Sequence, residues 1–301
     1  MLSFLKKLQK KKEKDMPTTA LAFSEEMISL ASFDQHQQLS CSVSIANDAH
    51  ALETLKKVIE EKGLTQRPCI CVLNPNDYQS FLVEKPEVPA ADIVNALRWR
   101  LADMIDYPLM SAQLDFIEVP HRHDAHQMIY VIAANKASLE HVQRFVTQAG
   151  LNAVKMIIPE LAIGSILLNK AGDHKTKVLV FFEASSIHLV IYKNDLLLLM
   201  RRFNDSLSQQ PENFNTFAEH VALEVQRSLD YCSTHMMDTS NAMIYLSGHI
   251  RARELSHQME TILGLPVYPF QADHLPGLNT RADLIPISYT AIGGALGGSQ
   301  L

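Results

Sequence analysis

The chain has 301 residues, enough for two globular lobes with buried cores. Its formal net charge of −6 gives no global attraction to nucleic acid, and no apolar run reaches the roughly 18 residues of a membrane-spanning helix. The four cysteines are not spaced like a disulfide framework, which favours a reducing, cytosolic compartment. We therefore expect a cytoplasmic protein.

Residues 1–16 form a separate basic segment. Leu5 and Leu8 fall on one face at helical spacing, and six lysines, Lys6 and Lys7 among them, supply positive charge. This pattern predicts a short amphipathic anchor on an anionic membrane surface. A disordered basic tail and a helix docked on a partner are the alternatives.

Residues 17–173 are expected to form a first lobe. Short apolar runs predict two strands around a polar turn, and strict alternation predicts a third. A helix that ends at Gly63 and a buried strand follow. The expected ranges are 19–23, 27–33 and 39–45 for the three strands, 52–59 for the helix and 68–73 for the last strand.

A second unit is inserted into this lobe at about 78–150. A helix is expected over 90–105, a hairpin over 113–119 and 128–134, and a helix over 136–149 that ends at Gly150. A strand over 151–158 and a helix from Pro159 complete the lobe.

The same element order recurs over 174–284. The expected strands are 178–182, 187–192, 196–201, 242–246 and 266–268, and the expected helices are 211–235 and 251–263. A last helix, within 285–301, should return to the junction of the lobes. The duplicated βββαβα order predicts an α/β, two-lobe fold of the actin-like ATPase (ribonuclease H-like) type.

Four stretches resemble PilM-type proteins, which have this fold. The first stretch comprises residues 94–100, 107–108 and 114–116, and the other three are 224–231, 244–248 and 289–297. In size and content the chain most resembles the MshI branch, which serves the mannose-sensitive haemagglutinin (MSHA) type IV pilus. The cytoplasmic domain of the type II secretion L protein is a related possibility.

The resemblance implies a cytoplasmic adaptor of a type IV pilus assembly platform, associated peripherally with the inner membrane. Such a protein would bind the cytoplasmic N-terminal segment of a PilN-like single-pass inner-membrane protein and contact other platform components. No nucleic-acid partner is expected.

The residues that hold nucleotide in actin-like ATPases are missing. Aligning the two Asp-x-Gly hairpins places Ala22 and Ser24 in the first and Phe181 and Glu183 in the second. The adenosine turn keeps Ser247-Gly248. Neither metal-positioning carboxylate is present, so we expect no catalytic residues, no cofactor and no enzyme activity. A divergent ATP-binding switch is the alternative.

Two other features suggest binding. His121, His123 and His126 are metal-ligand types, but they fall at an expected hairpin tip, where polar residues are ordinary, so no metal site is assigned. Trp99, the only tryptophan, lies beside Arg100 on the inserted unit. These two residues predict a partner surface in a groove between the first lobe and the inserted unit; a core edge is the alternative for Trp99.

Overall fold

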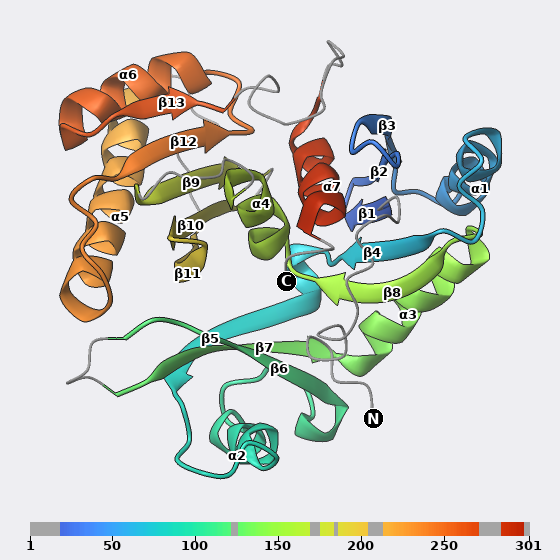
Figure 1. Ribbon diagram of the computed structural model, residues 1–301, viewed down its shortest axis with the longest axis horizontal. Helices are drawn as coiled ribbons and strands as arrows, with labels where there is room; N and C mark the ends of the chain where they lie inside the picture. The colour runs from blue at the N-terminus through green and yellow to red at the C-terminus, as the bar shows by residue number, and fades with distance from the viewer. Residues whose placement is uncertain are drawn as a thin grey trace.

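A computed structural model describes residues 19–121, 126–168, 175–183, 186–203, 213–270 and 284–297. These residues form two five-stranded sheets and one three-stranded sheet, each covered by helices (Figure 1). None of the helices in these ranges is both long and apolar enough to cross a bilayer.

The first-lobe sheet has the strand order β3-β2-β1-β4-β8. Its strands are β1 (Thr19–Phe23), β2 (Met27–Phe33), β3 (Leu39–Ala46), β4 (Pro68–Val72) and β8 (Asn152–Ile157). Alternate residues of β1 face opposite sides. Leu21 packs in the core with α1 (Ala51–Glu61) and α3 (Lys136–Gln148), whereas Ala20 and Ala22 face α7 (Pro286–Gly297).

The second-lobe sheet repeats this arrangement with the order β11-β10-β9-β12-β13. In both lobes the first strand pairs antiparallel with the second and parallel with the fourth. The strands are β9 (Lys177–Phe182), β10 (Ile187–Lys193), β11 (Leu196–Phe203), β12 (Met243–Ser247) and β13 (Val267–Pro269). The helices are α5 (Phe214–His235) and α6 (Ala252–Leu263).

The inserted unit is a sheet of order β5-β7-β6 with one helix. Its elements are β5 (Tyr78–Glu84), α2 (Ile93–Arg100), β6 (Ala112–Glu118) and β7 (Met128–Asn135). Strand β5 was not predicted, and the helix expected over 90–105 is shorter. The helical hydrogen bonding stops where Ala102 N–H bonds to the Trp99 carbonyl, although Leu101 and Ile105 remain in the core.

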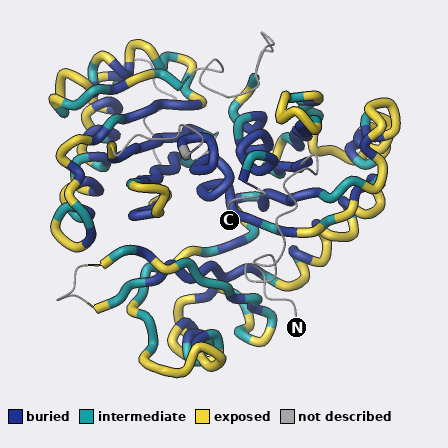
Figure 2. The backbone as a smooth tube through the Cα atoms, in the orientation of Figure 1, coloured by how far each residue is buried: buried dark blue, intermediate teal, exposed yellow. Residues whose placement is uncertain are grey.

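Helix α7 packs between the first-lobe sheet and α4 (Pro159–Leu168). A side chain at Gly293 would clash with the backbone carbonyl of Ala162, and one at Gly294 would press against Val72 and Ala20. Small residues on all three elements therefore permit this close approach. Figure 2 shows α4, α7 and the central strands buried, and the outer helices α1 and α6 partly exposed.

Candidate functional site

The hairpin between β1 and β2 closes on itself. The Ser24 hydroxyl donates to the Met27 carbonyl and accepts from the Met27 N–H, each at 3.1 Å. Ala22 is fully buried under α7, in a cluster of small and branched apolar residues. The polar side chains beside it are serines: Ser29 pairs with Ala22 across the sheet and accepts a hydrogen bond from Ser44 at 3.0 Å, and the Ser44 hydroxyl lies 3.1 Å from that of Ser288 on α7. The position of the expected carboxylate is therefore occupied by a methyl group next to hydroxyls.

The hairpin between β9 and β10 is equally unsuited to phosphate. Phe181 is buried and its ring meets the His188 ring edge-on, with 6.2 Å between ring centroids. Glu183 forms an ion pair with His188, with 3.4 Å between Oε2 and Nε2. A carboxylate directed at a bound phosphate would repel it.

Aromatic rings occupy the region of the turn after β12. His249 stacks on Phe217 with 5.3 Å between centroids and contacts the rings of Phe182 and Phe214. Gly248 has a φ of +88°, and a side chain there would clash with the Phe182 carbonyl. The buried Ser247 hydroxyl has no hydrogen-bond partner among the described residues. The aromatic rings fill the space next to this glycine turn.

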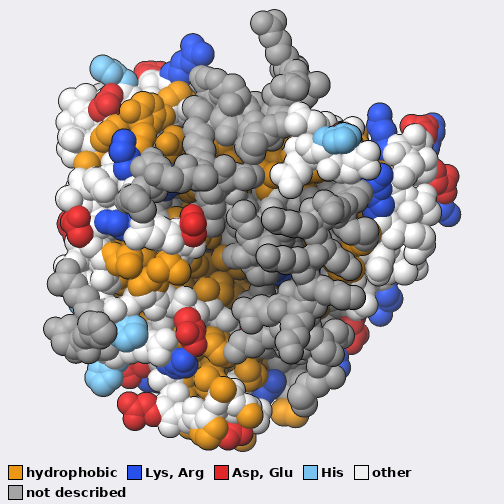
Figure 3. Space-filling view, viewed as in Figure 1, with side chains coloured by type: hydrophobic (Ala, Val, Ile, Leu, Met, Phe, Trp, Pro, Cys, Tyr) orange, Lys and Arg blue, Asp and Glu red, His pale blue; other side chains and the backbone are white. Residues whose placement is uncertain are grey.

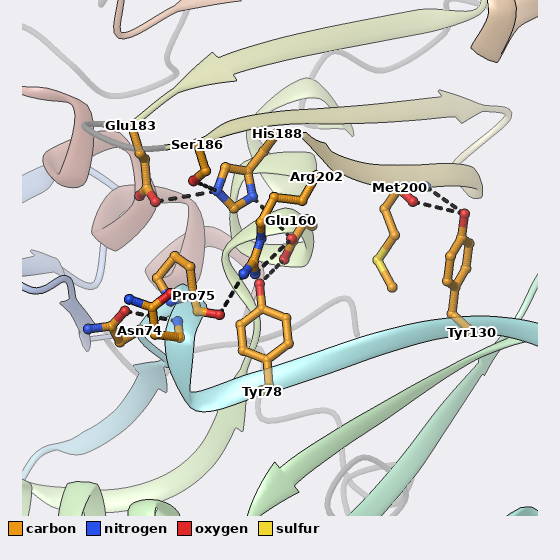
Figure 4. A network of polar contacts seen from close by, with 11 residues as sticks. Asn74, Pro75, Tyr78, Tyr130, Glu160, Glu183, Ser186, His188, Met200 and Arg202 are labelled. Atoms are coloured by element: carbon orange, nitrogen blue, oxygen red, sulfur yellow. Dashed lines mark hydrogen bonds and ion pairs between the residues drawn. The ribbon is translucent and has the colours of Figure 1, made fainter. Parts of the chain in front are cut away.

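A buried polar network joins the lobes beside the second hairpin (Figure 4). His188 Nδ1 lies 3.1 Å from Glu160 Oε1 on α4, and Tyr78 at the start of β5 donates to Glu160 Oε2 at 2.5 Å. Arg202 on β11 lies 3.7 Å from Glu160 and donates to the Pro75 carbonyl at 2.7 Å. The first lobe, the inserted unit and the second lobe all contribute to this network.

The ionisation states of the network follow from its geometry. Burial alone would lower the pKa of His188, but hydrogen bonds and charge from Glu160 and Glu183 outweigh it and raise that pKa to about 9. Burial would raise the pKa of Glu160, but His188, Arg202 and Tyr78 lower it to about 2. At neutral pH the network therefore holds two carboxylates, one imidazolium and one guanidinium.

Ser186, His188 and Glu160 have the spacing of a nucleophile, base and acid. The Ser186 hydroxyl lies 3.0 Å from His188 Nε2, and Glu160 lies on the Nδ1 side. However, a general base must be unprotonated, and His188 carries its proton at neutral pH. Glu183 also competes for Nε2. The contacts of the network join α4, β5, β10 and β11.

An apolar groove lies between the first lobe and the inserted unit. It is small, with a cavity volume of about 20 Å³. Gln113 and Asp115 are the polar members of its lining. The other lining residues are Leu73, Leu114, Ile132, Ala134, Leu139, Met156, Ile157, Ile158 and Leu161.

Both walls of this groove contain edge strands. Strand β6 is at the edge of the inserted sheet and β8 is at the edge of the first-lobe sheet. Residues 113–115 of β6 and 156–157 of β8 line the groove. Edge strands present backbone groups that an added strand can pair with. This small apolar groove thus lies between two strand edges.

Trp99 and Arg100 are not in this groove, so its expected wall was wrong. Helix α2 packs on one face of the inserted sheet, through Ile93 and Leu97, and Trp99 projects to solvent with 78% of its surface exposed. The opposite sheet face, with Tyr130 and Ile132, joins the core shared with the lobes. Helix α2 therefore lies on the side of the inserted sheet that faces away from this groove.

The remaining expectations fall largely outside the described residues. Residues 1–18, including Leu5, Lys6, Lys7 and Leu8, are not described, nor is His123. Among the described residues, no group of three or more His, Cys, Asp or Glu side chains is arranged to hold a metal ion.

The centre of the buried network was not predicted from the sequence, because Glu160, His188 and Tyr78 were not expected to form a site. A signal was present, because Glu160 is a lone carboxylate in an otherwise apolar helix and His188 is flanked by apolar strand residues. Charged residues are rarely buried unless they are paired.

Comparison with solved structures confirms the actin-like fold. No family model and no curated protein matches the sequence. A PilM–PilN type IV pilus biogenesis complex superposes with a TM-score of 0.71 at 16% identity, covering 95% of this chain and 99% of that one.

Two further structures resemble the chain less closely. One is the cytoplasmic domain of EpsL, an inner-membrane component of the Vibrio cholerae type II secretion system. It superposes with a TM-score of 0.53 at 13% identity, covering 93% of this chain and 94% of that one. The other is the ethanolamine utilization protein EutJ from Carboxydothermus hydrogenoformans. It superposes with a TM-score of 0.50 at 12% identity, covering 94% of this chain and 90% of that one. At these identities the likeness establishes the fold alone.

Proposed function

We propose that this chain is a catalytically silent cytoplasmic adaptor of a type IV pilus assembly platform. The groove between its first lobe and inserted unit holds the cytoplasmic N-terminal segment of a PilN-like, single-pass inner-membrane protein. The observation that carries the proposal is this groove, with its apolar lining and two edge strands. The likeness to a PilM–PilN complex over nearly the whole chain supports it.

The proposal of catalytic silence rests on the side chains at the two hairpins where actin-like ATPases hold nucleotide. ATP and magnesium do not fit the residues there, because Ala22 and Phe181 are buried apolar side chains and Glu183 is engaged with His188. The lobes are instead joined by protein contacts through Glu160 and Arg202. Partner binding thus needs no nucleotide-driven closure. A divergent ATP-dependent switch is the competing function.

Two finer assignments belong to the same proposal. The MshI-like size and content favour a pilus of the MSHA type, and association with the inner membrane follows through the partner. The likeness to the EpsL cytoplasmic domain supports a type II secretion scaffold as a second candidate. The PilN-like and L-type systems would supply different partner segments, so peptides from both distinguish them.

The test is titration of labelled N-terminal peptides from candidate partners, followed by fluorescence anisotropy. Met156→Lys places a charge on the apolar groove wall and should weaken binding at least about tenfold, which corresponds to 1.4 kcal/mol. Val154→Lys is the matched control, because Val154 is exposed on the same strand and outside the groove lining. Equal weakening by both variants, or by neither, would place the interface elsewhere.

A further inference from the structure

Three segments that line the groove also contact the second lobe. Leu73 follows strand β4, Ile132 lies on β7, and Ile158 and Leu161 lie at the start of α4. Close to each of these lining residues, the same segment carries a side chain or carbonyl that contacts β10 or β11. The groove and the lobe interface therefore share the same short supporting segments.

The start of α4 makes the first of these links. Ile158 and Leu161 line the groove, whereas Glu160 between them is only 3% exposed and contacts the second lobe. Its carboxylate lies 3.1 Å from His188 Nδ1 on β10 and 3.7 Å from Arg202 Nη2 on β11. A buried charge that loses its partner is left uncompensated, which is costly. The position of this helical turn, and of the two groove residues on it, thus depends on side chains of the second lobe.

Arg202 makes the second link, to the segment that follows β4. Its Nη1 donates to the Pro75 carbonyl at 2.7 Å, and its guanidinium lies over the Tyr78 ring, 5.0 Å from the ring centroid. At the groove end of this segment, the Leu73 N–H donates to the Ile157 carbonyl at 2.9 Å, and both residues line the groove. Figure 4 shows Arg202 reaching this segment from β11. One side chain of β11 therefore contacts two of the three lining segments.

The inserted unit makes the third link. Tyr130 and Ile132 are alternate residues of β7, so they share one face of the strand. Ile132 lines the groove, and the Tyr130 hydroxyl bonds to the backbone of Met200 on β11. Figure 3 shows side chains, many of them hydrophobic, filling the space that separates the ribbons of β11 and β5 in Figure 1. On this face the second lobe packs directly against the unit that forms one wall of the groove.

We propose that Glu160 and Arg202 are positioning residues for the groove, so that the second lobe sets how tightly the groove holds its peptide. The lining residues themselves all belong to the first lobe and the inserted unit. This inference rests on the proposed function, because it assigns the second lobe a part in peptide binding. A wall that is fixed before binding loses less conformational freedom when the peptide binds, which raises affinity.

Hydrogen exchange of the free, full-length chain tests this support without a peptide. Arg202→Met removes the charge and both contacts, and it should fold because the Arg202 side chain is 28% exposed. The Ala162 amide, bonded to the Ile158 carbonyl at 3.1 Å, reports on the first turn of α4. The Leu255 amide, on α6, reports on the second lobe. The variant should raise the ratio of the Ala162 exchange rate to the Leu255 exchange rate about tenfold.

Two further variants make this exchange ratio decisive. Met259→Ala is the control, because Met259 is fully buried on α6, which packs on α5, β12 and β13, so it should lower stability without raising the ratio. Tyr78→Phe removes only the hydrogen bond to Glu160 and decides the matter if Arg202→Met does not fold. A ratio unchanged from the wild type in the deciding variant, or an equal rise in Met259→Ala, would overturn the proposal.

Peptide affinity provides the second arm, measured by anisotropy with the labelled partner peptide. Arg202→Met should weaken binding about tenfold, Arg202→Lys should recover most of the affinity, and Met259→Ala should bind as the wild type does. If the wild type binds no peptide, the proposed function fails, and the exchange ratio still decides the positioning role. Binding by the wild type that Arg202→Met leaves unchanged would overturn the positioning role and leave the proposed function intact.

Discussion

The hydroxyl of Tyr130 makes two hydrogen bonds with the backbone of Met200. It donates to the Met200 carbonyl and accepts from the Met200 N–H, each at 3.0 Å (Figure 4). Met200 lies on β11, the edge strand of the second lobe, and Tyr130 lies on β7 of the inserted unit. One buried side chain therefore satisfies both backbone groups of an edge residue and joins two units distant in sequence.

Tyr130→Phe removes this contact while keeping the ring. Both backbone groups of Met200 then lose a buried partner, so the free energy of unfolding should fall by about 1–3 kcal/mol. Denaturant unfolding measures the loss, and hydrogen exchange should show faster exchange at the Met200 amide. Tyr231→Phe, in which the altered ring is less buried, serves as the control. Unchanged stability and exchange would show that the contact contributes nothing.

His188→Gln tests the buried network. It leaves Glu160 and Glu183 without the imidazolium between them, and breaking a buried ion pair from one side costs about 3–5 kcal/mol. Ser186→Ala removes one hydrogen bond but keeps both ion pairs, so its effect should be about 1 kcal/mol. Denaturant unfolding of the two variants measures the free energy of unfolding that each one loses. Equal losses in the two variants would contradict the assigned roles.

The same histidine predicts a pH dependence. Its folded-state pKa of about 9 lies above the ordinary 6.5, so its stabilising contribution is complete below pH 6.5 and is lost as pH rises to 9. The shift corresponds to about 3 kcal/mol. Glu160, with its pKa lowered to about 2, acts in the opposite sense, and its contribution is lost only as pH falls from 4.5 towards 2.

Unfolding free energies measured from pH 6 to 9.5 should therefore decline in the wild type. The decline should be much smaller in His188→Gln, which lacks the titrating group. Parallel pH profiles for the two proteins would show that His188 does not titrate as described.

Much of the fold was predictable because both lobes have strong local signals. Strands β9 and β10 are apolar runs separated by turns, and the Asn194-Asp195 turn, with positive φ at both residues, is typical of a tight hairpin. Strand β5 was missed because neither of its faces is cleanly polar: Phe81 and Val83 pack towards α2, while Tyr78 and Leu82 pack towards the lobes.

The site was less predictable, since it depends on residues brought together from distant parts of the chain. The absence of Asp-x-Gly was visible in the sequence, but the pairing of Glu160 with His188 arises only when α4 lies against β10. Likewise the apolar spacing of α2 predicted a buried face but not which side of the inserted sheet that face would cover.

Residues 1–15 should be dispensable for folding and should aid binding to anionic membranes. Near such a surface each lysine contributes about 1 kcal/mol to binding. Deleting residues 1–15 should leave the unfolding midpoint unchanged and reduce sedimentation with phosphatidylserine vesicles. Neutral vesicles are the control. Undiminished binding of the deletion variant to the anionic vesicles would refute the anchor.

The central claim is that this chain works through a peptide in its groove and not through nucleotide. The most direct test is one set of thermal melts of the full chain, alone, with magnesium-ATP and with the partner's N-terminal peptide. A ligand at 100 times its Kd adds about 2.7 kcal/mol of stability. We predict that the peptide raises the melting temperature of the wild type but not that of Met156→Lys. Magnesium-ATP should leave the melting temperature unchanged. Stabilisation by magnesium-ATP, with no effect of the peptide, would contradict the account.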